Sequence, residues 1–276
     1  GKLSVVNPTT GCGGTNCATS VLDAWQDGVP VLFISGNVRL DTCSGFINRN
    51  KNINIRRYGI QEHHVVDTYQ STTKLSRFID DVSDVAYYVS LAMHICNESR
   101  KGPVWLDIPG DIQLSKMPDK PLMYKPNPLK QLHSSCNYDD LKSKLSKAKR
   151  PLVLAGYGIR RSNNVGNFVR FINKYQIPYV STYGARDYTT NDDRLSIGAI
   201  GQRGSRAGNF ALQNADLLLI LGSTLNASVI GYDPKQFSPK SYKVQIDVDD
   251  QETKKDIVKI DKIYNDDLKF FFEEMI

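Results

Sequence analysis

The sequence has 276 residues, enough for one large domain or two ordinary ones. Hydrophobic residues make up 40% and charged residues 23%, so a disordered chain is not predicted. The net charge of +6 is spread along the chain without the aromatic and basic interleaving of a nucleic-acid-binding module. No apolar run approaches the roughly 20 residues of a membrane-spanning helix. Composition therefore predicts a globular, cytoplasmic protein that binds neither nucleic acid nor a membrane.

The five cysteines form no CxxC pair, and none has a histidine at metal-ligand spacing. This usage is typical of reduced thiols in an intracellular protein. Cys12 is a candidate nucleophile, because it lies in a glycine-rich turn where a helix N-terminus could activate it. No histidine is placed by the sequence to act as its base, so the reading of reduced thiols is favoured.

Apolar runs and helical spacing alternate along the first half of the chain. They predict strands at 3–6, 29–35 and 104–109 and helices at 15–26, 60–69 and 81–96. The cluster of turn formers NPTTGCGGTN separates the first strand from the first helix. The polar stretch 37–57 is predicted to be a long loop.

A change of composition divides the chain. Residues 116–136 hold four prolines and scattered lysines, which is typical of an extended linker. We therefore predict domains at 1–115 and 137–276, with this linker between them.

The second half repeats the alternation of strands and helices. We expect helices at 138–147, 163–175, 206–214 and 266–274 and strands at 151–155, 177–181, 217–221 and 243–248. The predicted fold class is α/β, with two doubly wound parallel-sheet domains.

The loops that follow the strands are the places to look for chemistry, because ligands of parallel α/β sheets lie at the carboxyl ends of strands. The first such loop is the glycine-rich turn at residues 9–16. Its glycines permit a tight turn and a close approach to a ligand. The pattern alone leaves a purely structural strand-to-helix turn equally open.

At this turn the sequence resembles a known family. The run GKLSVVNPTTGCGGTN, followed by DAWQDGVPVLFISGNV, resembles the pyrimidine-binding domain of the acetolactate synthase-like thiamine-diphosphate (ThDP) enzymes. That domain carries T-x-G-P-G-x-T-N and then D-x-x-P-x-x-x-I-x-G-Q. The resemblance continues through GIQE at 59–62, Thr73-Lys74 and GPVWLDIPGD at 102–111. In the second half, GAIGQRGSRAGNFALQNADLLLILGSTL and VQIDVDD resemble the family's Rossmann-like central domain.

The resemblance implies a cofactor site and an activity. Thr9, Cys12, Gly13 and Asn16 match the turn that contacts the pyrimidine ring, and Gln61 matches a glutamine that faces the active site across a dimer interface. It implies ThDP with Mg²⁺ as the cofactor, a 2-keto acid substrate, lyase or transferase chemistry, and a homodimer or homotetramer. Bound cofactor would act as the electron sink when CO2 leaves the substrate.

The resemblance also implies that parts of the enzyme lie outside this chain. The family's catalytic glutamate precedes the first strand seen here, and its diphosphate and metal are held by a C-terminal domain with a GDG motif. No Gly-Asp-Gly occurs in this sequence. We therefore expect the chain to be a portion of a longer enzyme, with the N-terminal part of the pyrimidine-binding domain missing, and to be inactive alone.

Several positions depart from the family pattern. Cys12 replaces a proline, Asn37 a glutamine and Gly110 a lysine near the substrate entrance. The stretch 222–225 lacks the arginine of flavin-binding members, and the turn 156–158 has only part of a dinucleotide fingerprint. Bound FAD is therefore not expected, and the central domain is interpreted as a structural spacer.

Two groups of charged residues invite other interpretations. Glu62, beside His63 and His64, is interpreted as an interface or surface residue rather than a substitute for the missing glutamate. A further group of acidic residues is interpreted as strand-end caps and solvated turns rather than a hard-cation site: Asp107, Asp247, Asp249 and Asp250.

Three other functions stay open at this point. One is a decarboxylase of the same family. Another is a non-catalytic subunit or paralogue that binds a partner ThDP enzyme. The third is an NAD- or FAD-binding protein that uses only the central sheet.

Overall fold

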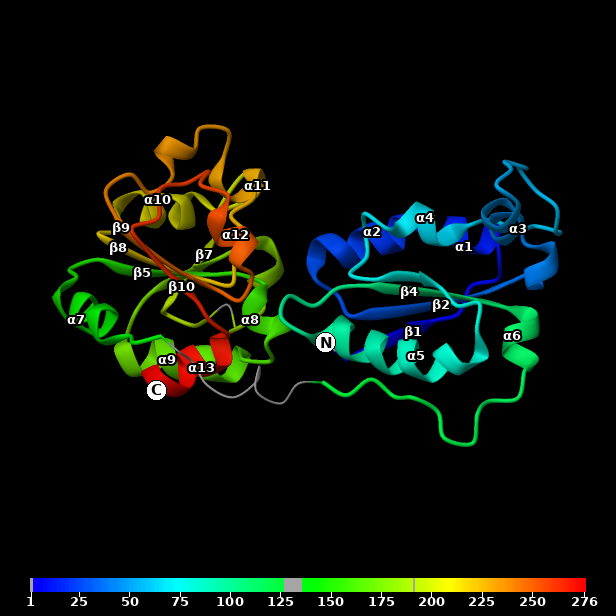
Figure 1. Cartoon of the computed structure of the whole chain (residues 1–276). Helices are drawn as coiled ribbons and strands as arrows, with labels where there is room; N and C mark the ends of the chain where they lie inside the picture. Colours follow the sequence, from blue (N-terminus) through cyan, green and yellow to red (C-terminus); the bar gives the residue numbers. More distant parts are fainter. Residues whose placement is uncertain (1, 127–135, 191) are drawn as a thin grey trace. The chain divides into compact units, whose positions relative to one another are not determined.

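The computed structural model describes residues 2–126, 136–190 and 192–276. It divides into two compact units, residues 1–130 and 131–276, here called the N-terminal and C-terminal units. Each is an α/β unit built on an all-parallel sheet (Figure 1), so the predicted fold class is confirmed. Residues 118–126 of the predicted linker form no helix or strand, and residues 127–135 lie outside the described residues.

The sheet of the N-terminal unit has the order β1-β2-β4-β3. Its strands are β1 (Ser4–Val6), β2 (Val31–Asn37), β3 (Ser76–Phe78) and β4 (Val104–Pro109). Every residue of β4 is buried, as expected for a central strand covered on both faces. Every residue of β1 is exposed, and this strand lies at one end of the strand order.

Helices cover both faces of this sheet (Figure 1). On one face lie α1 (Cys12–Asn16), α2 (Ala18–Asp27) and α4 (Val65–Tyr69), and on the other lies α5 (Val82–Asn97). The first face is centred on Trp105, whose ring stacks on Phe33 and Tyr69 with centroids 4.9 and 4.5 Å apart. These rings fix how α4 lies on the sheet.

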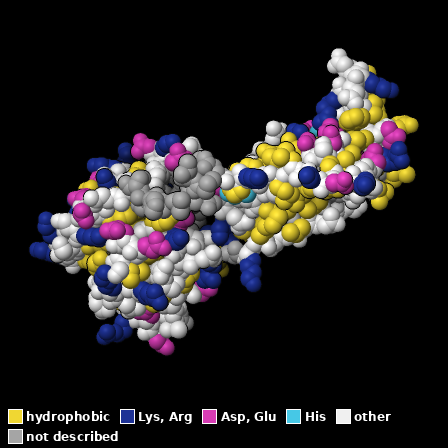
Figure 2. All heavy atoms as spheres, turned by 60° about the horizontal axis from the view of Figure 1, so that its bottom comes forward, with side chains coloured by type: hydrophobic (Ala, Val, Ile, Leu, Met, Phe, Trp, Pro, Cys, Tyr) yellow, Lys and Arg dark blue, Asp and Glu magenta, His cyan; other side chains and the backbone are white. Residues whose placement is uncertain are grey.

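The α5 side of this unit carries an apolar surface. Figure 2 shows hydrophobic side chains gathered over it. Met93 of α5 is 51% exposed, and Leu122 and Met123 of the following extended segment are 66% and 51% exposed. Tyr124 lies against the helix through its backbone N–H, which donates to the Ser90 hydroxyl.

The structure corrects three predictions for this unit. The stretch 37–57 is not one loop, since it contains η1 (Leu40–Thr42) and α3 (Ser44–Lys51). The helix predicted at 60–69 is only α4, because Gln61 has a left-handed φ of 57°. The helix predicted at 15–26 begins earlier and is divided at Cys17 into α1 and α2. Two elements, β3 and α6 (Gly110–Leu114), were not predicted.

The sheet of the C-terminal unit has the order β10-β9-β8-β5-β6-β7. Its strands are β5 (Pro151–Ala155), β6 (Tyr179–Ser181), β7 (Ser196–Ala199), β8 (Leu217–Leu221), β9 (Tyr242–Asp247) and β10 (Lys262–Asn265). The chain leaves β5 in one direction and later returns beside it as β8. This pair is therefore the switch point at which such sheets bind ligands.

Two apolar cores flank this sheet. One lies under α7 (Asp139–Lys147), α9 (Val165–Tyr175) and α13 (Leu268–Met275), and the other under α10 (Arg206–Asn214) and α11 (Ala227–Ile230) (Figure 1). Short elements complete the unit: α8 (Gly158–Arg161), η3 (Tyr183–Ala185), η4 (Pro234–Gln236) and α12 (Asp250–Lys254). In the described residues, no helix is long and apolar enough to cross a membrane.

Candidate functional site

The glycine-rich turn follows β1 at the carboxyl edge of the N-terminal sheet. The Asn7 side-chain amide donates to the Ile34 carbonyl at 2.7 Å and ties the start of the turn to β2. Thr9, Cys12 and Asn16 are exposed, and Gly13 is half-buried. The turn thus offers polar side chains beside a backbone that a ligand can approach.

Gly11 brings this turn against the loop that holds Gln61. Its φ is +58°, and a Cβ at this position would stand 1.6 Å from the Gln61 carbonyl oxygen. Only glycine permits both the conformation and the contact. The structure therefore places all five predicted cofactor residues on two adjoining segments: Thr9, Cys12, Gly13, Asn16 and Gln61.

The turn is supported from below by the aromatic core. The Tyr69 hydroxyl donates to the Gly14 carbonyl at 2.6 Å. A Cβ on Gly14 would lie 3.1 Å from Val65 and 3.6 Å from Trp105. The position of the turn is thus set by side chains of α4 and β4.

Glu62 organises the neighbouring loop. Its carboxylate accepts hydrogen bonds from the backbone N–H groups of Ser44 at 2.7 Å, Tyr58 at 2.7 Å and Gly59 at 3.2 Å. Burial opposes the charged form, but these donors outweigh it and lower the pKa of Glu62 below its usual value. This carboxylate acts as a loop clamp, and its lowered pKa does not suit a general acid.

The two histidines after Glu62 have separate partners. The His63 Nε2 atom lies 2.7 Å from the Thr68 hydroxyl, and the His64 Nδ1 atom lies 2.9 Å from a carboxylate oxygen of Asp67. The His64 ring occupies space that a side chain at Gly45 would fill, since a Cβ there would stand 2.4 Å from the ring. His63 is therefore tied to a local hydrogen-bond partner, whereas both ring nitrogens of His64 are buried without a hydrogen bond to any described residue and its Nδ1 atom only lies close to the Asp67 carboxylate.

A buried carboxylate at Asp107 was missed by the sequence analysis, which interpreted it as a strand-end cap. Asp107 lies in β4 and is fully buried. Its oxygens accept from the Ser35 hydroxyl at 2.6 Å and from the Asn37 amide at 2.7 Å. Burial raises the pKa of Asp107 to about 6, although these bonds and the nearby His64 lower it. The sequence did hold a sign of this group, because Ser35, Asn37 and Asp107 are polar residues within or next to apolar strand runs.

In the C-terminal unit the corresponding glycine turn closes on its own fold. A Cβ on Gly156 would stand 2.1 Å from the Gly222 carbonyl oxygen, and the Gly158 N–H donates to that oxygen at 2.9 Å. The Tyr188 hydroxyl donates to the Gly156 carbonyl at 2.9 Å, and burial raises the pKa of Tyr188. The glycines here allow two loops to pack together at the switch point.

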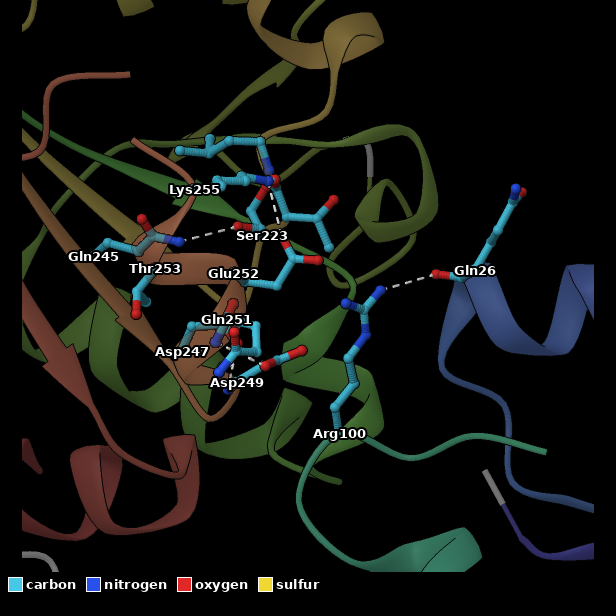
Figure 3. A network of polar contacts seen from close by, with 12 residues as sticks. Gln26, Arg100, Ser223, Gln245, Asp247, Asp249, Gln251, Glu252, Thr253 and Lys255 are labelled. Atoms are coloured by element: carbon cyan, nitrogen blue, oxygen red, sulfur yellow. Dashed lines mark hydrogen bonds and ion pairs between the residues drawn. The ribbon is translucent and has the colours of Figure 1, made fainter. Parts of the chain in front are cut away.

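Polar contacts fix the loops around this switch point (Figure 3). The Gln245 side-chain amide points to the Ser223 carbonyl at 3.4 Å, and Lys255 donates to the Thr224 carbonyl and pairs with Glu252 at 2.7 Å.

The acidic residues of this end belong to local turns. Asp247 accepts from the Asp249 N–H, Asp249 caps α12, and Asp250 pairs with Lys254. Across the described residues, no group of three or more His, Cys, Asp or Glu side chains is placed to hold a metal ion.

Comparison with known proteins decides the family. Residues 1–69 match the thiamine pyrophosphate enzyme N-terminal TPP binding domain, and residues 138–268 match the thiamine pyrophosphate enzyme central domain. The chain belongs to the thiamine pyrophosphate enzyme family. It is of the acetolactate synthase-like type that the sequence resemblance indicates.

Its relatives include acetolactate synthases. The acetolactate synthase large subunit of Lactococcus lactis is 32% identical over 272 residues, which cover 98% of this chain and 45% of the relative. The isozyme 1 large subunit of Escherichia coli is 29% identical, with 90% and 42% covered. Acetolactate synthase 3, chloroplastic, of Brassica napus is 31% identical, with 91% and 37% covered. The chain thus spans less than half of the length of these relatives.

The residues of the turn suit one end of ThDP. A flat aminopyrimidine needs a backbone it can approach and neighbouring hydroxyl and amide groups to hydrogen bond, and Gly13, Thr9 and Asn16 have these properties. A diphosphate with Mg²⁺ needs oxygen ligands from carboxylates or carbonyls. The described residues contain no acidic cluster for that end. The chain therefore fits the pyrimidine end of the cofactor.

Proposed function

We propose that this chain supplies the pyrimidine-binding and central domains of a ThDP- and Mg²⁺-dependent acetolactate synthase-like enzyme. The enzyme would decarboxylate a 2-keto acid and join the product to a second carbonyl compound. The chain alone would be inactive, because the glutamate and the metal-binding domain of the family are not recognised in its sequence. Domains at 1–115 and 137–276, joined by 116–136, are part of this proposal.

One observation carries the proposal. The turn at residues 9–16 and the loop of Gln61 meet at Gly11 on the carboxyl edge of a parallel sheet, and both lie within the residues that match the N-terminal TPP binding domain. In the proposed enzyme the turn would bind and orient the pyrimidine ring. Gln61 would face the substrate from across the subunit interface of a homodimer or homotetramer. Bound ThDP would supply the electron sink for loss of CO2.

The central domain would act as a structural spacer without FAD. Support comes from the turn at 156–158, where the Gly158 N–H already donates to the protein backbone at 2.9 Å. Dinucleotide phosphates are bound by such N–H groups when they point outward. Absorbance of the purified native protein near 450 nm tests this point, since a stoichiometric flavin signal would contradict it.

The first experiment measures the native polypeptide in its source cells. A mass well above the 30.9 kDa of this chain is expected, together with consumption of pyruvate that requires both ThDP and Mg²⁺. The recombinant 276-residue chain is the matched control and should show no turnover. A long native protein that binds ThDP but does not consume 2-keto acids would overturn the substrate assignment.

The same measurement tests a second function. A native mass of 30.9 kDa would favour a non-catalytic paralogue that binds a partner ThDP enzyme. Such a protein should then copurify with a longer ThDP enzyme from the same cells and change its activity when added back.

A further inference from the structure

The buried carboxylate of Asp107 is held by neutral donors. Asp107 is 0% exposed, and both of its oxygens accept hydrogen bonds from uncharged side chains, Ser35 and Asn37. The Trp105 indole N–H in turn donates to the Ser35 hydroxyl at 2.9 Å. A carboxylate taken out of water is costly, and two neutral donors offset this only in part. The carboxylate of Asp107 determines how its partners are oriented, since an ionised carboxylate can only accept hydrogen bonds.

That requirement fixes the amide of Asn37. The Asn37 Nδ2 group must face Asp107, at 2.7 Å, and it also lies 3.3 Å from the His63 carbonyl. The Oδ1 atom is then turned toward the Thr10 hydroxyl at 3.1 Å and the Val38 N–H at 2.8 Å. The ionised carboxylate thus dictates that Asn37 accepts from Thr10 and donates to the loop of His63.

Asn37 therefore contacts both segments of the proposed cofactor site. Thr10 belongs to the glycine-rich turn, and His63 lies two residues after Gln61. The same two segments meet directly where Gly11 packs on the Gln61 carbonyl. Moving the Asn37 amide would move one segment relative to the other.

We infer that Asp107 is a positioning residue which, through Asn37, sets where the glycine-rich turn stands relative to the Gln61 loop. It touches neither segment itself. Its importance for cofactor binding rests on the proposed function, whereas the mechanical coupling of the two segments does not. Protonation of Asp107 would weaken its bond to the Asn37 amide, whose position would then depend on the Val38 N–H and the His63 carbonyl alone.

Other ionisable groups lie on the elements that pack over this face of the sheet, and the test must separate them from Asp107. They include Cys17, Cys43, Arg49, Glu62, His63, His64, Asp67 and Tyr69. The two histidines matter most, because imidazoles gain a proton in the same range of pH.

The test follows backbone amide resonances of the 276-residue chain by NMR between pH 4.5 and 8. The amides of Thr10, Gly11 and Gln61 are expected to shift together with a midpoint near the pKa of Asp107, about 6. Asp107→Asn should abolish that shared midpoint. A double variant, His63→Gln with His64→Gln, should keep a shared midpoint and move it to higher pH, because His64 then no longer lowers the pKa of Asp107. A midpoint that survives in Asp107→Asn, or that is lost in the histidine variant, would overturn the inference.

A second variant guards against a folding failure of Asp107→Asn. Thr10→Val removes only the last link of the chain of hydrogen bonds and leaves the buried part intact. The amide of Gly11 should then stop titrating while that of Gln61 continues. If both amides still shift together, Asn37 does not transmit the change.

A separate experiment measures the ThDP dependence of activity in the full-length native enzyme. Asp107→Asn should raise the ThDP concentration for half-maximal activity by about tenfold, the size of one lost hydrogen bond, with a smaller change in kcat. The control Asp216→Asn removes a carboxylate that binds the backbone of Lys149 and Arg150 in the other unit, and it should leave this concentration unchanged. No ThDP dependence in the wild type would defeat the proposed function alone. Absence of a shared midpoint at Thr10, Gly11 and Gln61 in the wild-type chain would defeat the positioning role alone.

Discussion

The two units contain the same local device and use it differently. In each, a strand runs into a glycine turn, and a buried tyrosine hydroxyl donates to a glycine carbonyl of that turn: Tyr69 to Gly14 in one and Tyr188 to Gly156 in the other. The N-terminal turn meets a loop through Gly11 and leaves polar side chains exposed. In the C-terminal turn, the backbone of Gly222 fills the space beside Gly156 and accepts the hydrogen bond of the Gly158 N–H.

The difference teaches that a glycine turn is open or closed according to the segment beside it. At Gly156 the neighbour is another tight turn, which seals the site. At Gly11 the neighbour is a loop held by the Glu62 clamp, with a buried charge at Asp107 below it. Ligand binding is therefore assigned by the surroundings of the motif and not by its glycines.

The largest expected loss of stability comes from alanine substitutions in the two glycine turns. Gly11→Ala places a Cβ 1.6 Å from the Gln61 carbonyl at a left-handed φ, and Gly156→Ala places one 2.1 Å from the Gly222 carbonyl. The free energy of unfolding should fall by about 4 kcal/mol for Gly11→Ala and about 3 kcal/mol for Gly156→Ala, since overpacking and strain add. Urea denaturation followed by far-UV circular dichroism measures both.

A helical glycine with free space around it is the matched control. A Cβ on Gly166, in α9, would meet nothing within 4 Å. Gly166→Ala should raise the free energy of unfolding by up to about 1 kcal/mol, because alanine favours a helix. Equal losses at Gly156 and Gly166 would show that the close packing at Gly222 is not what the glycine serves.

The next largest effect is a pH dependence of stability caused by Asp107, the buried carboxyl group near the N-terminal turn. The pKa of Asp107 is raised in the folded chain to about 6 from an ordinary value of 3.8, so between these values the folded state binds more protons than the unfolded state. Stability should fall as pH rises through this window, by about 2 kcal/mol between pH 4 and pH 7. The comparison is urea unfolding of wild type and Asp107→Asn, followed by tryptophan fluorescence, because both tryptophans lie in this unit. Identical pH profiles would contradict the buried charge.

A smaller loss of stability is expected when the loop clamp, Glu62, is substituted. Glu62→Gln weakens three backbone hydrogen bonds and should lower the free energy of unfolding by about 1.5 kcal/mol. Glu274→Gln, which removes one exposed ion pair with Lys142, should leave the free energy of unfolding almost unchanged, because water screens such pairs. Hydrogen exchange at Ser44 and Tyr58 should quicken only in the first variant, and unchanged exchange there would refute the clamp.

The smallest effect compares the shared tyrosines. Tyr69→Phe and Tyr188→Phe each remove one buried hydroxyl that donates to a glycine carbonyl, and each should cost about 1 kcal/mol of unfolding free energy. Thermal unfolding of the two variants measures this cost. A much larger loss in one of them would mean that the two turns are not supported alike.

Long periodic segments were predictable from the sequence. The runs PLVLA and LLLIL are strands because a parallel sheet buries both of their faces, and the apolar spacing of 206–214 marks α10. The edge strand β3 and the short α3 were missed, since neither has a clear apolar period. The helix predicted at 60–69 failed because Glu62 bonds the backbone of a loop.

The position of the candidate site could be predicted from the sequence, but the tertiary contacts that hold it could not. The glycine turn could be found because glycines and a following helix mark it. Its contact with Gln61 depends on a tertiary approach at Gly11 that no local pattern encodes. Asp107 was misread because a carboxylate inside an apolar strand looks like the strand's end, and only the register with Ser35 shows it to be paired.

The exposure of β1 has a practical consequence. Its three residues are all exposed, Val5 by 62%, and β1 ends the strand order of its sheet. An apolar edge strand is a template on which another chain can add by backbone hydrogen bonds. Preparations of this chain should therefore become turbid as they are concentrated, and a charge at the edge, Val5→Lys, should extend their shelf life.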